Sequence, residues 1–163
     1  MNWGATEAEC ARSLPCDGLR PRAVQVDRAI SIAAPRDLVY AWLCQLRKAP
    51  YSYDLLDNLG RRSPRHRDPK LTELAPGQRF MFAFDLVSFE PGAHITLVDG
   101  KLAVTYAVFP EGEGTRLVVR VRWGGVPRPL VRLLALGDLL MMRKQLLTLK
   151  ELAEAEAATV ARP

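Results

Sequence analysis

The alternation of apolar and polar residues predicts a strand near the start of the chain. Apolar side chains stand at alternate positions with one gap, at Val24, Val26, Ile30 and Ile32, as in a strand with one buried face. Arg28 fills the gap and points to the same side as Val26 and Ile30. A buried charge needs an opposite charge or a ligand group beside it. We therefore expect Arg28 to pair with a carboxylate, to extend its head to solvent, or to contact an anionic ligand group.

Two short helices are predicted after this strand. The first begins at Pro35, which a first helical position tolerates, and runs to about Leu46 with apolar residues three and four positions apart. The second covers residues 52–59, with Ser52 placed as its N-cap and Gly60 as its C-cap. Residues 61–77 contain prolines and arginines without an apolar period, which predicts a long mobile loop.

Residues 78–123 show the pattern of strands and turns. Strands are predicted over residues 80–90, 93–98, 101–109 and 115–123. Turn signals such as Pro91-Gly92 and Asp99-Gly100 separate them, which predicts an antiparallel arrangement. In the last strand Val119 and Trp123 share the face expected in the core. Arg120 and Arg122 share the other face, which we expect to be in solvent.

The chain is predicted to end in a long amphipathic helix. Gly137 interrupts a short helical stretch, and Asp138 caps a helix that runs to about Ala157. Its apolar stripe comprises Leu139, Met142, Leu146, Leu149 and Ala153. The order of strand, two helices, antiparallel strands and terminal helix predicts an α+β domain.

Composition agrees with one folded domain. The chain has 163 residues, of which 48% are hydrophobic and 25% charged, values typical of a single globular unit. We expect residues 1–20 to form a poorly ordered N-terminal arm, residues 21–158 the domain, and residues 159–163 a tail. Acidic Glu7 and Glu9 stand where a secretion signal needs positive charge, and charges interrupt the apolar region 126–152. These features predict a cytoplasmic protein without a membrane span.

The net charge of +5 does not by itself indicate a function for this domain. Much of the excess lies in the arginines of residues 61–70, where no aromatic residue is available to stack on bases, so nucleic acid is not expected as a partner. The three cysteines cannot all pair, and His66 and His94 lie far apart in the sequence. We expect no disulfide framework, no metal site and no cofactor.

Several segments together resemble a known family. They are residues 30–35 (ISIAAP), 39–43 (VYAWL), 50–54 (PYSYD), 57–58 (DN), 76–78 (PGQ), 114–117 (GTRL) and 150–154 (KELAE). In this order they resemble the SRPBCC superfamily, which includes START lipid-transfer domains, birch-pollen-allergen-like carriers and bacterial polyketide cyclases. The segment at 51–54 is similar to a bacterial subgroup. The resemblance implies a helix-grip fold, in which a curved antiparallel sheet of six to seven strands wraps around the C-terminal helix.

The resemblance also implies a cavity between the sheet and the helix, with its mouth near Tyr51, Tyr53 and the 61–77 loop. The candidate ligand-binding residues are Arg28, Tyr51, Tyr53, Phe82, Phe84, Tyr106, Trp123, Met142 and Leu146. Tyr106 and Trp123 rank above the aliphatic residues because each has a polar atom that needs a partner when buried. Catalytic residues are not assigned, since Asp54 and Asp57 are explained by the dipole of the short helix.

Three functions remain open at this point. The first is binding of a small hydrophobic ligand, such as a lipid, a polyketide or an aromatic metabolite, with a homodimer left open. The second is an enzyme like the polyketide cyclases, aromatases and dehydrases, which requires polar groups that converge inside the cavity. The third is an interaction module that uses the basic loop and has a closed core.

Overall fold

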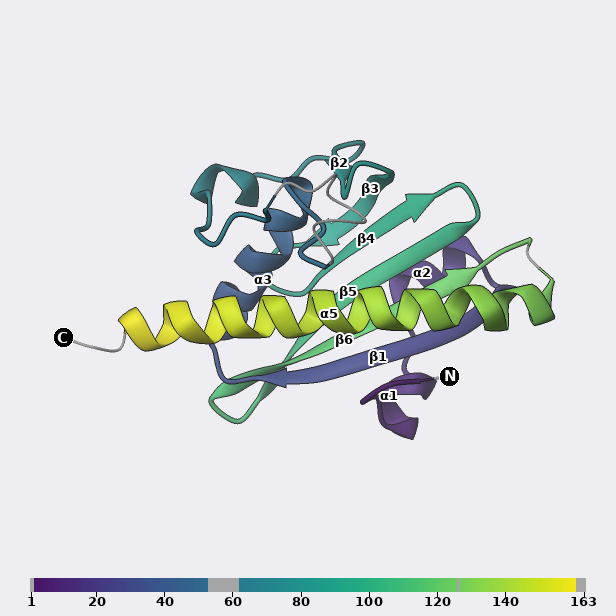
Figure 1. The fold of residues 1–163 in the computed structure, drawn as a ribbon, viewed down its shortest axis with the longest axis horizontal. Helices are drawn as coiled ribbons and strands as arrows, with labels where there is room; N and C mark the ends of the chain where they lie inside the picture. The colour runs from purple at the N-terminus through teal and green to yellow at the C-terminus, as the bar shows by residue number, and fades with distance from the viewer. Residues whose placement is uncertain (1, 53–61, 126, 161–163) are drawn as a thin grey trace.

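A six-stranded, curved antiparallel sheet forms the centre of the molecule, and one long helix lies across one face of it (Figure 1). The computed structural model describes residues 2–52, 62–125 and 127–160. The sheet order is β1-β6-β5-β4-β3-β2. The strands are β1 (Val24–Ile32), β2 (Arg79–Phe80), β3 (Phe84–Glu90), β4 (His94–Asp99), β5 (Leu102–Glu111) and β6 (Gly114–Trp123). The predicted α+β helix-grip architecture is confirmed.

Helix α3 (Arg36–Cys44) follows β1 and continues as the 3-10 helix η1 (Gln45–Arg47), close to the predicted bounds. Its apolar side packs on the same sheet face as the long helix, with Trp42 only 2% exposed. The indole Nε1 of Trp42 donates to Glu156 near the chain end, which joins the two helices. Most of the second predicted helix, over residues 52–59, lies outside the described residues. The 3-10 helix η2 (Pro69–Thr72) lies within the predicted loop.

The terminal helix α5 (Arg128–Val160) is continuous, so the predicted break at Gly137 and cap at Asp138 are wrong. A glycine inside a helix costs only about 1 kcal/mol relative to alanine, which the packing of α5 on the sheet can offset. Met142, Leu146, Leu149 and Ala153 are buried, as the predicted stripe requires. Asp138 turns its carboxylate toward β1 instead of capping the helix.

The predicted strand over residues 80–90 is divided by a tight turn. Met81 and Phe82 have φ of 46° and 65°, in the left-handed region that reverses the chain direction. Phe80 then pairs with Phe84, so β2 and β3 form a short hairpin. The sequence carries no glycine, asparagine or proline at this turn, and its apolar residues gave the appearance of one strand.

The pairing of β1 with β6 decides which side chains enter the core. Arg28 lies opposite Val119, and Asp27 lies opposite Arg120. Because successive side chains alternate between faces, Arg28 and Val119 point toward α5 while Asp27 and Arg120 point to the other face. The predicted division of the last strand into two faces is therefore right. The expected exposure is wrong, because Arg120 is 1% and Arg122 is 8% exposed.

The N-terminal segment covers these arginines. It contains α1 (Glu7–Ala11) and α2 (Pro15–Leu19), which lie on the sheet face opposite α5. Leu14 and Cys16 pack there against small sheet residues in a second apolar cluster. This packing differs from the poorly ordered arm expected from the sequence, because the attachment depends mainly on polar groups that have no periodic signal.

Arg120 is the central attachment of this N-terminal cover. Its Nε donates to Asp27 at 2.7 Å and its Nη1 to Asp17 at 2.8 Å. The remaining N–H groups donate to the carbonyl oxygens of Glu9, Cys10 and Arg12. All five guanidinium N–H groups thus have acceptors. Two carboxylates and three carbonyl groups compensate the burial of this charge.

The first residues also protect the free edge of the sheet, since β1 is an edge strand. The Trp3 amide donates to Asp27 O at 3.1 Å, and its carbonyl accepts from the Ala29 amide at 2.9 Å. Gly4 has φ of +69°, and a Cβ there would lie 2.2 Å from the Ala29 carbonyl oxygen. Only glycine fits so close to the strand.

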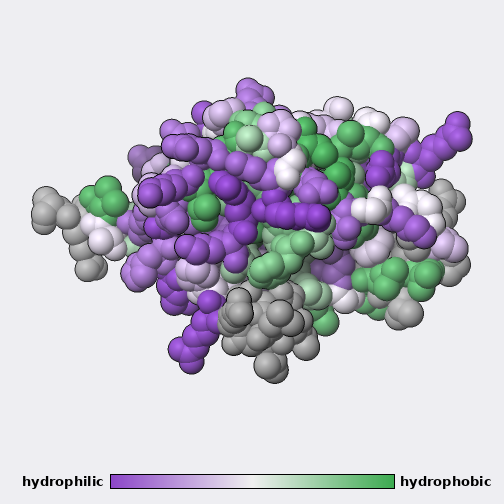
Figure 2. Space-filling model, turned by 90° about the horizontal axis from the view of Figure 1, so that it is seen from above, coloured by the Kyte–Doolittle hydropathy of each residue, from purple (hydrophilic) through white to green (hydrophobic). Residues whose placement is uncertain are grey.

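The early part of α5 presents apolar residues to the outside. Leu136 is 53% and Leu140 is 60% exposed, and Figure 2 shows apolar surface at the end of the molecule where α5 begins. No helix among the described residues is long and apolar enough to cross a membrane.

We expect Arg120→Met to lower the free energy of unfolding by about 3–5 kcal/mol, because it leaves Asp27 buried without its cation. Arg116→Met is the matched control on the same strand face. Arg116 is 18% exposed, so this substitution should lower the free energy of unfolding by less, about 1 kcal/mol. Urea unfolding measures both values. Equal effects of the two substitutions would contradict the description of Arg120 as the main attachment.

Glu9 should make the attachment of the cover depend on pH. Hydrogen bonds from Arg116 lower the pKa of Glu9 from 4.5 to about 2. The carboxylate therefore stabilises the fold fully above about pH 5, and this contribution is lost as the pH falls toward 2. We expect Glu9→Gln to be less stable than the parent by about 1 kcal/mol at pH 7. Unfolding at pH 7 and pH 3 should show the difference shrinking; a constant difference would argue against this pairing.

Candidate functional site

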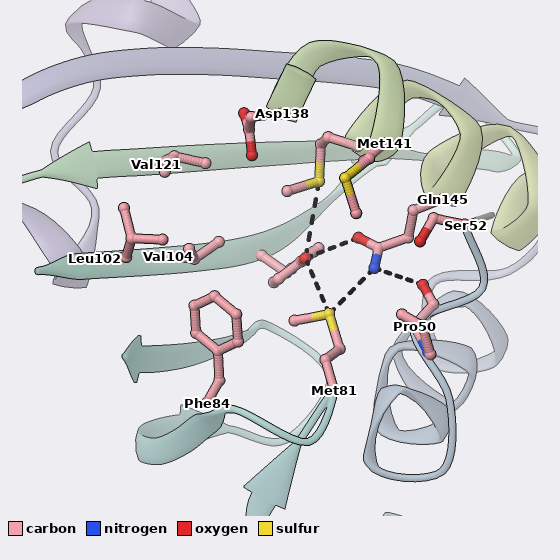
Figure 3. Close-up of a pocket in the computed structure, with 12 residues that line it drawn as sticks. Pro50, Ser52, Met81, Phe84, Leu102, Val104, Val121, Asp138, Met141 and Gln145 are labelled. Atoms are coloured by element: carbon pink, nitrogen blue, oxygen red, sulfur yellow. Dashed lines mark hydrogen bonds between the residues drawn. The ribbon is translucent and has the colours of Figure 1, made fainter. Parts of the chain in front are cut away.

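A cavity of about 180 Å³ lies between the sheet and α5 (Figure 3). The sheet supplies its floor from β5 and β6, α5 supplies one wall, and the β2–β3 hairpin and the chain after η1 supply the rest. The lining residues are Pro50, Ser52, Met81, Phe84, Leu102, Val104, Tyr106, Val121, Asp138, Met141, Met142 and Gln145. Most are apolar, as is usual for a site that holds a small molecule.

A chain of hydrogen bonds crosses the inner end of the cavity. Gln145 Nε2 donates to the Pro50 carbonyl oxygen at 2.7 Å, and the Tyr106 hydroxyl lies 2.8 Å from Gln145 Oε1. The Pro50 carbonyl oxygen can only accept a hydrogen bond, so the amide nitrogen of Gln145 must face Pro50. The amide oxygen of Gln145 then faces Tyr106. Tyr106 therefore donates to Gln145, and its own oxygen remains an acceptor. Burial raises the pKa of Tyr106, so the phenol keeps its proton.

Methionine sulfur atoms surround this chain. Gln145 Nε2 also donates to Met81 Sδ at 3.2 Å, and the Tyr106 oxygen lies 3.7 Å from Met142 Sδ. Figure 3 shows Met81 and Phe84 on the hairpin side and Met141 on the helix side. Unbranched methionine side chains adjust to irregular shapes, so this wall can accommodate ligands of somewhat different outline.

The second polar element of the cavity is the carboxylate of Asp138. Its Oδ2 accepts from Arg28 Nη2 at 3.2 Å, and Arg28 Nη1 donates to the Asp27 carbonyl oxygen at 3.1 Å. The Arg28 side chain is 0% exposed and that of Asp138 is 22% exposed. Burial raises the pKa of Asp138, and the positive charge of Arg28 opposes this shift. The carboxylate lines the cavity while its cation stands behind it.

The structure brings some of the predicted site residues together. Phe84, Tyr106 and Met142 line the cavity. Leu146 is fully buried in the adjacent core. Arg28 adjoins the site through Asp138, and its pairing with a carboxylate is one of the alternatives expected from the sequence.

The other predicted residues lie elsewhere. Phe82 is at the β2–β3 turn and is 61% exposed. Trp123 packs at the edge of the core at the end of β6, outside the cavity lining. Tyr51 is 1% exposed and meets Trp42 edge-on, although its neighbours Pro50 and Ser52 border the cavity. Tyr53 lies outside the described residues, as do Asp54 and Asp57.

Sequence reasoning missed Asp138, Gln145 and Met81 as site residues. Asp138 was interpreted as a helix cap, although it lies one helical turn before the buried Met142. Gln145 lies between two buried positions of the helix, and a polar residue there could have indicated an inward contact. Met81 enters the site through the unforeseen turn and had no signal.

The site contains acid–base groups. Among the described residues, no group of three or more histidine, cysteine, aspartate or glutamate side chains could hold a metal ion. Among the described residues of the cavity lining, Asp138 and Tyr106 are titratable. Chemically, the arrangement can hold an apolar body and offer hydrogen-bond partners at its polar end.

Comparisons with known proteins relate this chain to others by fold. No family model and no curated protein sequence matches it. A protein of known structure from Chromobacterium violaceum, CV1439, is 16% identical with a TM-score of 0.51, over 80% of this chain and 96% of its own. The protein KanY is 15% identical with a TM-score of 0.57, over 81% of this chain and 98% of its own.

A third similar structure is StfQ, the di-domain ARO/CYC of the steffimycin biosynthetic pathway. It is 16% identical with a TM-score of 0.52, and the match covers 86% of this chain and 54% of StfQ. The chain thus spans about half the length of StfQ. At these identities the likeness shows the shared helix-grip fold alone.

The Arg28–Asp138 pair should be sensitive to loss of one partner. We expect Arg28→Met to lower the free energy of unfolding by about 3–5 kcal/mol, because the Asp138 carboxylate then stays in an apolar site without its cation. The double variant Arg28→Met/Asp138→Leu should recover most of this loss. Urea unfolding compares the three proteins; a double variant no more stable than the single one would show that the carboxylate is not the cause.

Proposed function

We propose that the protein binds a small, mainly apolar molecule in the cavity between the sheet and α5. The observation that supports this best is the cavity itself, which the apolar residues of the sheet and the methionines leave open. Protein interiors are usually packed without voids larger than a water molecule. A cavity of about 180 Å³ is an exception that a ligand would explain.

The size of the cavity narrows the candidates. An apolar protein cavity of about 150 Å³ holds benzene, whereas sites for larger ligands measure roughly 300–1,000 Å³. The volume of this cavity is close to that of the benzene-sized cavity, which favours a single-ring aromatic molecule or a short chain as the ligand. A complete lipid or a polycyclic polyketide would require further space.

The second candidate is an enzyme that resembles the cyclases, aromatases and dehydrases of polyketide synthesis. It is supported by Asp138, a carboxyl group with a raised pKa in the cavity lining, and by Tyr106 in the same lining. Groups with shifted pKa values inside a cavity are candidates for proton transfer. The fold shared with StfQ is compatible with this candidate and does not decide it.

The basic loop has less support as an interaction surface. Arg65 and Arg67 make ion pairs with Glu151 and Glu156 of α5, which neutralise part of the positive charge that an acidic partner would need. The interaction-module hypothesis also predicts a closed core, whereas the structure contains a cavity.

Toluene is a suitable first probe, because its single ring fits the cavity volume. We expect saturable binding to the native protein, seen as chemical-shift changes of the Met81, Met141 and Met142 methyl groups in NMR spectra. Met142→Trp should fill the cavity and abolish these changes while the protein stays folded.

Leu140→Trp is the matched control on the same helix. Leu140 is 60% exposed and does not line the cavity, so this variant should bind toluene like the parent. The proposal fails if toluene does not bind to the parent, or if both tryptophan variants bind it equally.

A further inference from the structure

Gln145 and Tyr106, two polar side chains of the cavity lining, both use their hydrogen-bond donors within the protein. Gln145 directs its two N–H groups to Pro50 and Met81. Tyr106 directs its only proton to Gln145. In these three hydrogen bonds the Tyr106 oxygen only donates, so its lone pairs accept no hydrogen bond from Gln145.

Asp138 adds a second acceptor. Its Oδ2 accepts from Arg28, and no described residue donates to its Oδ1. The carboxylate lines the cavity, so Oδ1 can receive a hydrogen bond from a molecule inside it. Hydrogen bonds to a charged acceptor contribute about 1.5–3 kcal/mol, more than those between neutral groups. The Ser52 hydroxyl can donate as well as accept, so Ser52 does not decide whether the cavity prefers a ligand group that donates or one that accepts.

Charge excludes two ligand classes. A carboxylate in the cavity would lie near the negative charge of Asp138, and the donors of Gln145 and Tyr106 are already used within the protein, so its burial would have a high cost in free energy. An ammonium group would find Asp138 already neutralised by Arg28, and the pair has no net charge to compensate a second cation. An uncharged molecule avoids both penalties.

Resting on the proposed function, we infer that the ligand is an uncharged, single-ring or short-chain molecule with a hydroxyl group that donates to the Asp138 carboxylate. The apolar body lies against the methionines and Phe84, and the hydroxyl lies at the Arg28–Asp138 end. In this arrangement Arg28 is a positioning residue, because it holds Asp138 and stands outside the cavity lining.

Five probes of similar size test this inference by the same methionine-methyl NMR titration. They are toluene, p-cresol, anisole, benzoate and benzylamine. Anisole has as many non-hydrogen atoms as p-cresol and an oxygen that can only accept. We expect p-cresol to bind about tenfold more tightly than toluene or anisole, the ratio that one such hydrogen bond provides. Benzoate and benzylamine should bind at least tenfold more weakly than p-cresol.

Asp138→Asn tests the role of the carboxylate. Its amide oxygen can still accept from Arg28, which directs the amide nitrogen, a donor, into the cavity. The preference for p-cresol over anisole should therefore fall from about tenfold to less than about threefold. Asp85→Asn is the control, because Asp85 is a half-exposed residue paired with Arg79 on β3. That variant should keep the tenfold preference.

The outcomes separate the two proposals. If neither toluene nor p-cresol binds, the proposed function itself fails. If toluene binds but p-cresol has no advantage over anisole, or if benzoate or benzylamine binds as tightly as p-cresol, the cavity is a binding site and the inference about the hydroxyl is wrong. Should Asp138→Asn not fold, the comparison of the five probes on the parent protein still decides.

Discussion

The ion pair between Arg28 and Asp138 is the interaction on which the arrangement of the site depends. It joins the middle of the edge strand β1 to the first half of α5, where α5 has few buried apolar side chains among its described residues. Farther along, Leu146 and Leu149 hold the helix by apolar packing. The charged contact therefore supports α5 across the stretch that borders the cavity. It also brings a carboxylate, which ordinarily avoids an apolar interior, to the cavity wall.

The sheet keeps two sets of buried charges apart. Arg28 belongs to the α5 face and Arg120 to the opposite face, although they are only one register pair apart. On the α5 face the charge is compensated by Asp138 and borders a space for a ligand. On the opposite face five acceptors surround Arg120 and fill its hydrogen-bonding capacity. A guanidinium whose N–H groups all have acceptors in its own chain is suited to a structural role. A carboxylate whose second oxygen accepts from no described residue is suited to recognition.

The N-terminal cover changes how this sheet meets its surroundings. An antiparallel sheet with one helix-covered face commonly leaves its other face in water, and the arginines of β6 suggested such a face. The cover closes it with Leu14 and Cys16 and uses the arginines as attachment points. The residues near Trp3 also occupy part of the free edge of β1. Both faces of β1 and β6 are therefore supported, which restrains β6, one of the two strands that form the floor of the cavity.

Local patterns along the sequence determined the elements of this protein. Alternation gave the position and faces of β1 and β6, and helical spacing gave the buried side of α5, because these patterns depend on neighbouring residues alone. Tyr106 and Met142 could be assigned to the interior for the same reason.

Tertiary structure decided the rest. Asp138, which pairs with Arg28, lies 110 residues away from it. The cover reaches β6 across more than 100 residues, and the Met81–Phe82 turn has no glycine to mark it. Such contacts leave no period in the sequence, because their energy arises only when the folded sheet brings distant charges and carbonyl groups together.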